Sequence, residues 1–279
     1  MTIGQALAAA TARLAGAGIE SARLEAELLL ARACDDCARA LLYAELDREL
    51  TPGQAAALEA GVVRRERREP LAYVLGEWGF RRLTLKTDRR ALIPRPETEV
   101  VVERALQHIA RLDRPNVLDV GTGTGAIALA IADEHDGAQV TAIDVSSDAL
   151  QLARENLAAA GVDGRVRLVE HDLTSGLGAD EFDLVVSNPP YVEPEELATL
   201  QPEIRDWEPH IALVAREATE AVARAATEAL KPQGWLVLES ASGAAERVGR
   251  LLQELGYEQI TITPDLAGRD RVVEGRWTG

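Results

Sequence analysis

The segment Asn188–Pro189–Pro190–Tyr191 follows directly after an apolar run, Phe182–Val186. Ligands of doubly wound folds bind where the strands end. Two prolines restrict the backbone, so the Asn188 side-chain oxygen and the Pro189 carbonyl are held as two hydrogen-bond acceptors. Such a pair can hold both hydrogens of an NH2 group on a planar carbon, and Tyr191 can stack on that group. The segment predicts a clamp for a planar amide or amino nitrogen.

Methylation is the chemistry that needs such a clamp. An amide nitrogen delocalises its lone pair into the carbonyl and is a poor nucleophile, so it must be oriented toward the methyl donor. Positioning of this kind contributes up to ~7–11 kcal/mol. Acceptors that match the charge building on the nitrogen add electrostatic stabilisation. No strong base is required beforehand, because a methylated, positively charged amide loses its proton readily.

A glycine-rich turn lies between a predicted buried strand, Val117–Val120, and a helix that begins near Ala126. Its backbone can approach a ligand closely, and the helix N-terminus offers free N–H groups. A second strand ends at Asp144, whose carboxylate can accept hydrogen bonds from both ribose hydroxyls. These features predict a nucleotide-type cofactor site that includes Asp144 and the turn Gly121, Thr122, Gly123, Thr124 and Gly125, and Asn188 is also expected to contact the cofactor.

The spacing of the turn favours S-adenosylmethionine over a dinucleotide. The dinucleotide pattern is G-x-G-x-x-G, whereas this chain has G-x-G-x-G with Asp119 close before it. A carboxylate there repels a pyrophosphate but suits a cationic sulfonium ligand with an α-amino group. Asp172 follows the third strand and is expected to accept the adenine amino group, with Leu173 packing on the ring. His171 is interpreted as a surface histidine.

Alternating strands and helices predict an α/β fold with a doubly wound, mostly parallel, Rossmann-like sheet. The expected strands are Val117–Val120, Gln139–Ile143, Val166–Val169, Phe182–Val186 and Trp235–Leu238, with Tyr257–Thr263 and Arg271–Trp277 at the C-terminal edge. Residues 1–70 are expected to form a small helical domain, in which Thr51–Pro52 starts a helix that ends before Pro70. Residues 71–92, including Tyr73–Thr87, are interpreted as a hairpin linker, and 93–279 as the catalytic domain.

The formal net charge of −16 argues against direct nucleic-acid binding, which needs a basic face. The arginines at 64, 65, 67 and 68 are interpreted as a solvated helix face. Cys34 and Cys37 lie between helical stretches and are interpreted as structural, and no residue cluster has metal-ligand spacing. With no membrane span or signal peptide recognised, a cytoplasmic protein is expected.

Nearly the whole chain resembles the HemK-type peptide chain release factor glutamine methyltransferases (PrmC). Besides Asn188–Tyr191, the resemblance rests on Leu92–Glu99 (Leu-Ile-Pro-Arg-Pro-Glu-Thr-Glu), Glu208–Pro209 and the Asp265–Arg271 segment. It implies that Asn188, Pro189, Pro190 and Tyr191 bind the glutamine of the release factor's Gly-Gly-Gln loop, and that S-adenosylhomocysteine is the product. It also implies that N-terminal helices help to dock the release factor. The segment implied to close over the site is Pro94, Arg95, Pro96, Glu97 and Thr98.

Two stretches depart from the family pattern, Val214–Thr219 and Ser240–Gly243. They put loop shape and partner fit in doubt more than the chemistry. Two other functions remain open. An exocyclic amine of a nucleic-acid base, such as that of adenine, would fit the same clamp, and a non-catalytic protein that binds S-adenosylmethionine would share the fold. The preferred release factor, the acceptance of other glutamines and the oligomeric state are not encoded in any recognisable motif.

Overall fold

The computed structural model describes residues 1–35, 37–162, 164–177, 182–214 and 217–279. The helices are α1 (Ile3–Gly16), α2 (Ala22–Ala33), α3 (Arg39–Ala44), α4 (Pro52–Glu66), α5 (Leu71–Leu75), α6 (Thr98–Ile109), α7 (Ala126–Glu134), α8 (Ser147–Ala160), α9 (Pro202–Arg205), α10 (Ala218–Ala229) and α11 (Ala245–Glu254). The strands are β1 (Glu77–Phe80), β2 (Leu83–Lys86), β3 (Asn116–Val120), β4 (Gln139–Asp144), β5 (Val166–Glu170), β6 (Phe182–Ser187), β7 (Leu230–Glu239), β8 (Tyr257–Pro264) and β9 (Asp270–Trp277). Short 3-10 turns lie at Leu173–Ser175, Leu197–Thr199 and His210–Ala212.

Seven strands form one sheet in the order β5-β4-β3-β6-β7-β9-β8. The pairs from β5 to β7 are parallel, and β9 pairs antiparallel with both β7 and β8. Chain order reverses between β3 and β6, and such a switch point is where doubly wound sheets bind ligands. The predicted fold class is confirmed, including the two extra strands at the C-terminal edge.

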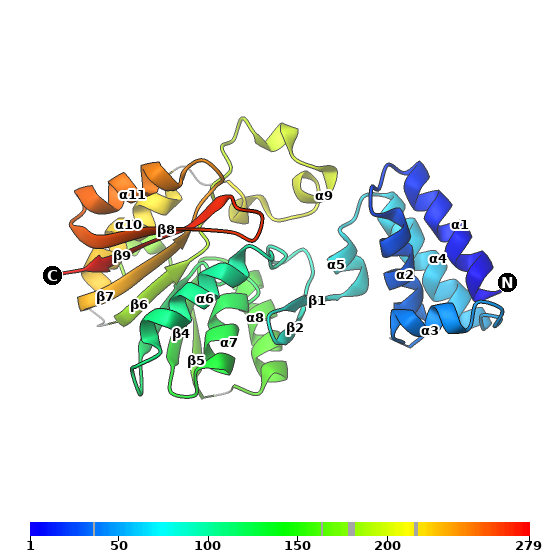
Figure 1. The fold of residues 1–279 in the computed structure, drawn as a ribbon, viewed down its shortest axis with the longest axis horizontal. Helices are drawn as coiled ribbons and strands as arrows, with labels where there is room; N and C mark the ends of the chain where they lie inside the picture. Colours follow the sequence, from blue (N-terminus) through cyan, green and yellow to red (C-terminus); the bar gives the residue numbers. More distant parts are fainter. Residues whose placement is uncertain (36, 163, 178–181, 215–216) are drawn as a thin grey trace. The chain divides into compact units, whose positions relative to one another are not determined.

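Alternate residues of the central strands enter two different cores, because successive side chains of a strand point to opposite faces. Val117 belongs to the core beneath α6 and α7, whereas its neighbour Leu118 belongs to the core beneath α10 and α11. Figure 1 shows these two helix layers on either side of the sheet. Burial on both faces explains the nearly continuous apolar runs in the sequence.

The chain divides into two compact units. One contains 1–77 together with 201–207, and the other contains 78–200 and 208–279. In the first unit, helices α1, α2 and α4 enclose an apolar core. Thr51 caps α4 as expected, since its hydroxyl accepts the Gln54 N–H and Pro52 occupies the first turn. Among the described residues, no helix has the length and apolar content needed to cross a membrane.

Two interpretations of the N-terminal region were wrong in part. Residues Tyr73–Leu75 belong to the short helix α5, so the hairpin comprises only β1 and β2. The arginine cluster is a solvated face only in part: Arg64 and Arg67 are exposed, whereas Arg65 is only 3% exposed and pairs with Glu25 and Glu203 at 2.6 and 2.9 Å. Arg68 also pairs with Glu203. Arg65 and Arg68 thus fasten the 201–207 segment to α4.

Gly125 joins the glycine-rich turn to α7 with a φ of 85°. An added Cβ would lie 3.1 Å from Leu129 Cδ1, which is tighter than ordinary packing. Gly161 also has a positive φ, 69°, but an added Cβ there meets no atom within 4 Å. A side chain at Gly161 would therefore add backbone strain alone, whereas one at Gly125 would add both backbone strain and steric crowding.

We expect Gly161→Ala to lower the free energy of unfolding by about 1 kcal/mol, because only backbone strain is added. Gly125→Ala is expected to cost roughly 1–3 kcal/mol more, because the methyl group also displaces Leu129. Thermal unfolding of both variants in one buffer tests the difference. Equal losses would show that packing against Leu129 does not restrict this position.

Candidate active site

The carboxyl ends of β3 and β6 lie side by side. Val120 pairs in register with Ser187, and the Ser187 hydroxyl donates to the Val120 carbonyl oxygen at 2.7 Å. The next residues along the two strands are Gly121 and Asn188. This pairing brings together the glycine-rich turn and the Asn-Pro-Pro-Tyr segment, which lie far apart in the sequence.

The glycine-rich turn is held against the end of β4. The N–H groups of Gly121 and Thr122 both donate to the Ile143 carbonyl oxygen at 2.9 Å. Asp144 Oδ2 accepts the Gly123 N–H, and its Oδ1 accepts the Ser146 N–H, each at 2.9 Å. Burial raises the pKa of Asp144, and these N–H groups oppose the rise. Each carboxylate oxygen retains a lone pair that can accept a ligand hydroxyl.

A cavity of about 280 Å³ lies over this edge of the sheet. Predicted site residues that line it are Gly121, Gly123, Asp144, Asp172, Leu173, Asn188, Pro189 and Pro190. Lining residues that the sequence analysis did not single out for the site include Arg90, Ala91, Val145, Ser187, Pro209 and Ile211. Most of these are apolar or adjoin a predicted residue, so their types alone gave little signal.

Thr122, Thr124 and Gly125 are absent from the cavity lining. Both threonines are buried, and the Thr122 hydroxyl donates to Asp119 Oδ2 at 2.6 Å. Asp119 itself is fully buried, and burial raises its pKa to about 7. Its Oδ1 has no hydrogen-bond partner among the described residues. Asp119 therefore stabilises the turn through its hydrogen bond to Thr122. It does not line the cavity, so its charge can act on a bound cation only electrostatically, without direct contact.

The side of the cavity beyond Asp144 is formed by the segment after β5. Leu173 is half-buried and packs against the core beneath α10, which gives an apolar surface for a flat ring. His171 was interpreted as a surface histidine, and this was wrong. Its ring lines the cavity, and Nε2 donates to the Gly176 carbonyl oxygen at 2.5 Å.

Asn188 is the first member of a hydrogen-bonded chain that leaves the cavity. Its Nδ2 donates to Thr98 Oγ1 at 3.3 Å, and the Thr98 hydroxyl donates to Glu239 Oε2 at 2.6 Å. Thr98 begins α6, and Glu239 ends β7. Glu239 was not predicted as a site residue, although a carboxylate at the end of a strand on this edge of the sheet was a usable signal.

The segment 94–98, which was predicted to close over the site, is held in place by ion pairs to other parts of the chain. Arg95 pairs with Glu208 at 2.5 Å, and Glu97 pairs with Arg269 at 2.9 Å. Burial raises the pKa of Glu208, and Arg95 opposes the rise. Residues 94–98 do not line the cavity, which on this side is formed by Arg90, Ala91 and Leu92. In the part of the chain that the structure describes, Thr98 is hydrogen-bonded to the lining residue Asn188.

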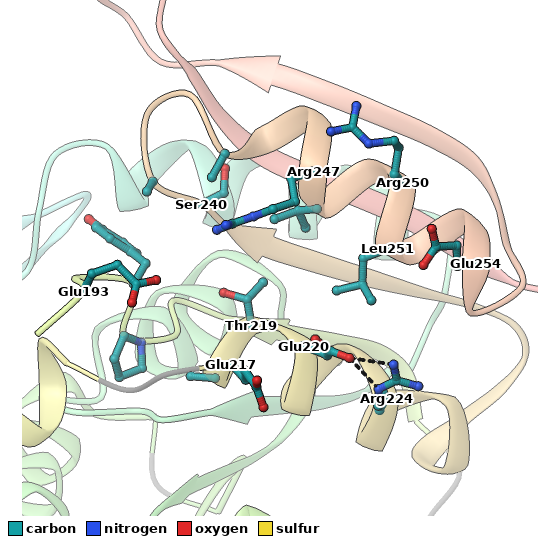
Figure 2. A pocket seen from close by; sticks show the side chains of 16 residues that line it. Glu193, Glu217, Thr219, Glu220, Arg224, Ser240, Arg247, Arg250, Leu251 and Glu254 are labelled. Atoms are coloured by element: carbon teal, nitrogen blue, oxygen red, sulfur yellow. Dashed lines mark hydrogen bonds and ion pairs between the residues drawn. The ribbon is translucent and has the colours of Figure 1, made fainter.

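A second pocket, of about 400 Å³, lies on the other side of the Asn-Pro-Pro-Tyr segment. Pro190 lines both cavities, whereas Tyr191 lines only the second. Figure 2 shows this pocket between α10 and α11, with Arg247 extending from α11 across it and Ser240 at its edge. The structure therefore places Asn188 and Tyr191 toward different cavities. Residues 215 and 216 of the atypical 214–219 stretch lie outside the described residues.

Comparison with known proteins places this chain in a family. Residues 99–204 match the methyltransferase small domain, and residues 5–76 match the PrmC N-terminal domain. The release factor glutamine methyltransferase of Deinococcus radiodurans is 42% identical and aligns over 100% of both chains. That of Cereibacter sphaeroides is 41% identical over 99% of both chains. The chain belongs to the release factor glutamine methyltransferase family.

The solved structure of the T. thermophilus 16S rRNA N2 G1207 methyltransferase (RsmC), in complex with AdoMet and guanosine, shares the fold. Its TM-score is 0.53 at 18% identity, over 72% of this chain and 49% of that one. This likeness concerns the fold alone. As a member of the glutamine methyltransferase family, the chain is an S-adenosylmethionine-dependent enzyme. The glycine turn, the Asp144 carboxylate and the apolar Leu173 surface fit that cofactor.

Asp144 offers a direct test of the cofactor site. Asp144→Asn replaces one acceptor oxygen by a donor and removes the charge, so we expect S-adenosylmethionine affinity to fall roughly 10- to 150-fold. Asp148→Asn, an exposed position in the first turn of α8, is the matched control and should change little. Calorimetric titration measures both. Unchanged affinity in Asp144→Asn would remove Asp144 from the ribose-binding role.

Proposed function

We propose that this chain methylates the side-chain amide nitrogen of the glutamine in the Gly-Gly-Gln loop of a peptide chain release factor, with Asn188–Tyr191 as the amide clamp. The observation that carries the proposal is the position of Asn188 and Pro189 on the wall of the cofactor cavity. Family membership supports the choice of substrate, because the full-length relatives are named for it.

The residues of the site suit an amide acceptor. S-adenosylmethionine supplies an electrophilic methyl group. Asn188 Oδ1 and the Pro189 carbonyl oxygen accept the two hydrogens of the glutamine NH2 group and so direct its nitrogen toward the cofactor cavity. Their partial negative charges stabilise the positive charge that develops on the nitrogen. Tyr191 contacts the substrate from the second pocket, and the proton leaves after transfer without a dedicated strong base.

A protein substrate agrees better with the surface chemistry than a nucleic acid. The formal net charge is −16, and several arginines of the 64–68 and 81–90 segments are paired with carboxylates of the chain. Arg65 and Arg68 bind Glu203, Arg81 binds Glu134, and Arg90 binds Asp88 and Glu155. We further propose that the helices of 1–70 dock the release factor and that 71–92 and 93–279 act as linker and catalytic domain.

The proposal predicts label transfer from methyl-labelled S-adenosylmethionine to a purified bacterial release factor. A factor with the loop Gln replaced by Ala should remain unlabelled, since it lacks the acceptor nitrogen. Duplex DNA, offered in parallel, should also remain unlabelled. Label on DNA alone would contradict the proposal and indicate a methyltransferase that acts on an amine of a nucleic-acid base.

Asn188→Ala should lower kcat with the release factor at least about 100-fold, because an acceptor for the developing charge is lost. Cofactor affinity should change little, because the glycine turn and Asp144 remain. Asn116→Ala is the matched control, since Asn116 is exposed at the start of β3. A nearly unchanged kcat in Asn188→Ala would contradict the clamp mechanism.

A further inference from the structure

We propose that Glu239, acting through Thr98, fixes the orientation of the Asn188 carboxamide so that its oxygen, and not its NH2 group, faces the substrate. This inference rests on the proposed function, because it concerns how the clamp receives an NH2 group. Glu239 and Thr98 are positioning residues, since they reach the reacting nitrogen only through Asn188.

The need for such a device follows from the symmetry of a carboxamide. The oxygen and the NH2 group of Asn188 have nearly the same size, and rotation by 180° exchanges them. A substrate NH2 group needs an acceptor, so the rotated form would present a donor to a donor. Sterics alone cannot distinguish the two forms, and only the hydrogen-bond partners of Asn188 can.

The Asn188–Thr98 and Thr98–Glu239 hydrogen bonds can have only one donor-to-acceptor direction when Glu239 is ionised. An ionised Glu239 can only accept, so the single hydrogen of the Thr98 hydroxyl is used at the 2.6 Å contact with Oε2. Thr98 Oγ1 then has only lone pairs left and must accept from its other neighbour. That neighbour is Asn188, whose Nδ2 lies 3.3 Å away. Asn188 Oδ1 is left as an acceptor without a donor among the described residues.

The hydrogen bonds from Asn188 through Thr98 to Glu239 are well shielded from water. Their donor–acceptor direction is therefore not easily reversed by solvent. Thr98 is 4% exposed and Glu239 is 1% exposed, so a broken link cannot be replaced cheaply by solvent. The elements that meet here lie far apart in the sequence, because α6, the end of β6 and the end of β7 each supply one member. Three separate elements thus converge on one carboxamide.

The charge state of Glu239 determines the direction. A protonated Glu239 could donate to Thr98, which could then donate to Asn188 Oδ1 and stabilise the rotated form. Burial raises the pKa of Glu239, while the Thr98 hydroxyl and the nearby Arg271 oppose the rise. Other charged or titratable groups near it include Glu97, Arg95 and Tyr191. Clamp function is therefore present above the raised pKa and is lost as the pH falls through it.

Thr98→Val and Thr98→Ser test the geometry. Valine keeps the shape of threonine without the hydroxyl, so kcat with the release factor should fall about 10-fold or more at saturating cofactor. Serine keeps the hydroxyl and should restore most of kcat. S-adenosylmethionine affinity should stay within about 2-fold in both variants, because neither the turn nor Asp144 is altered. Equal kcat values for valine and serine would overturn the proposal.

Glu239→Gln tests the charge. Glutamine can both accept and donate, so the direction is no longer fixed and kcat should fall. The part of the acid limb of the kcat–pH profile that we assign to Glu239, measured at saturating cofactor, should also disappear. A merely structural glutamate would lower kcat at every pH and leave the acid limb in place, and that result would overturn the assignment.

A direct view of the carboxamide separates this inference from the proposed function. In two-dimensional ¹⁵N NMR of the full chain with S-adenosylhomocysteine, the Asn188 NH2 signals, identified by their loss in Asn188→Asp, should move in Thr98→Val but hardly in Thr98→Ser. Unchanged signals in Thr98→Val would overturn the orientation mechanism whatever the substrate. Shifted signals without label transfer to any release factor would support the orientation mechanism while the proposed function fails.

Discussion

The register between β3 and β6 is the constraint on which the site depends. Parallel strands end at the same edge, and the pairing of Val120 with Ser187 makes Gly121 and Asn188 neighbours. A slip of one residue would exchange the side chains that β6 presents to its two cores and would disturb the packing of both. The Ser187 hydroxyl adds a hydrogen bond across the same position. The glycine-rich turn and Asn188 are thus placed by the packing of the whole sheet.

Buried acids surround this edge in a way that suits a cationic cofactor. Burial raises the pKa of Asp119, Asp144, Glu208 and Glu239, because each carboxylate loses solvation. A positively charged ligand in the cavity compensates part of that loss, whereas a pyrophosphate would increase it. The difference between a sulfonium and a dinucleotide cofactor therefore lies in the charge around the cavity as much as in the spacing of the glycines.

The sequence predicts the parts of the site that are contiguous. The glycine turn, Asp144 and Asn188–Pro190 each lie at the end of one strand, so local pattern and the switch-point rule were enough to bring them to one cavity. Contacts between residues far apart in the sequence could not be predicted from local pattern. Thr98 and Glu239 are 141 residues apart, and Arg65 and Glu203 are 138 apart. The inward orientation of Thr122 and Thr124 was equally hidden, because a turn's sequence does not say which side chains face its ligand.

An asparagine at position 188 raises a problem that an aspartate would avoid. A carboxylate accepts through either oxygen and needs no partner to orient it. At this position, however, it would lie near Glu239 and in a site where burial already raises the pKa of neighbouring acids. It would tend to hold a proton and become a donor at the substrate. A neutral carboxamide avoids that outcome but must be oriented, and in the proposed mechanism the Thr98–Glu239 pair does this with the charge two residues farther from the reacting nitrogen, behind Asn188 and Thr98.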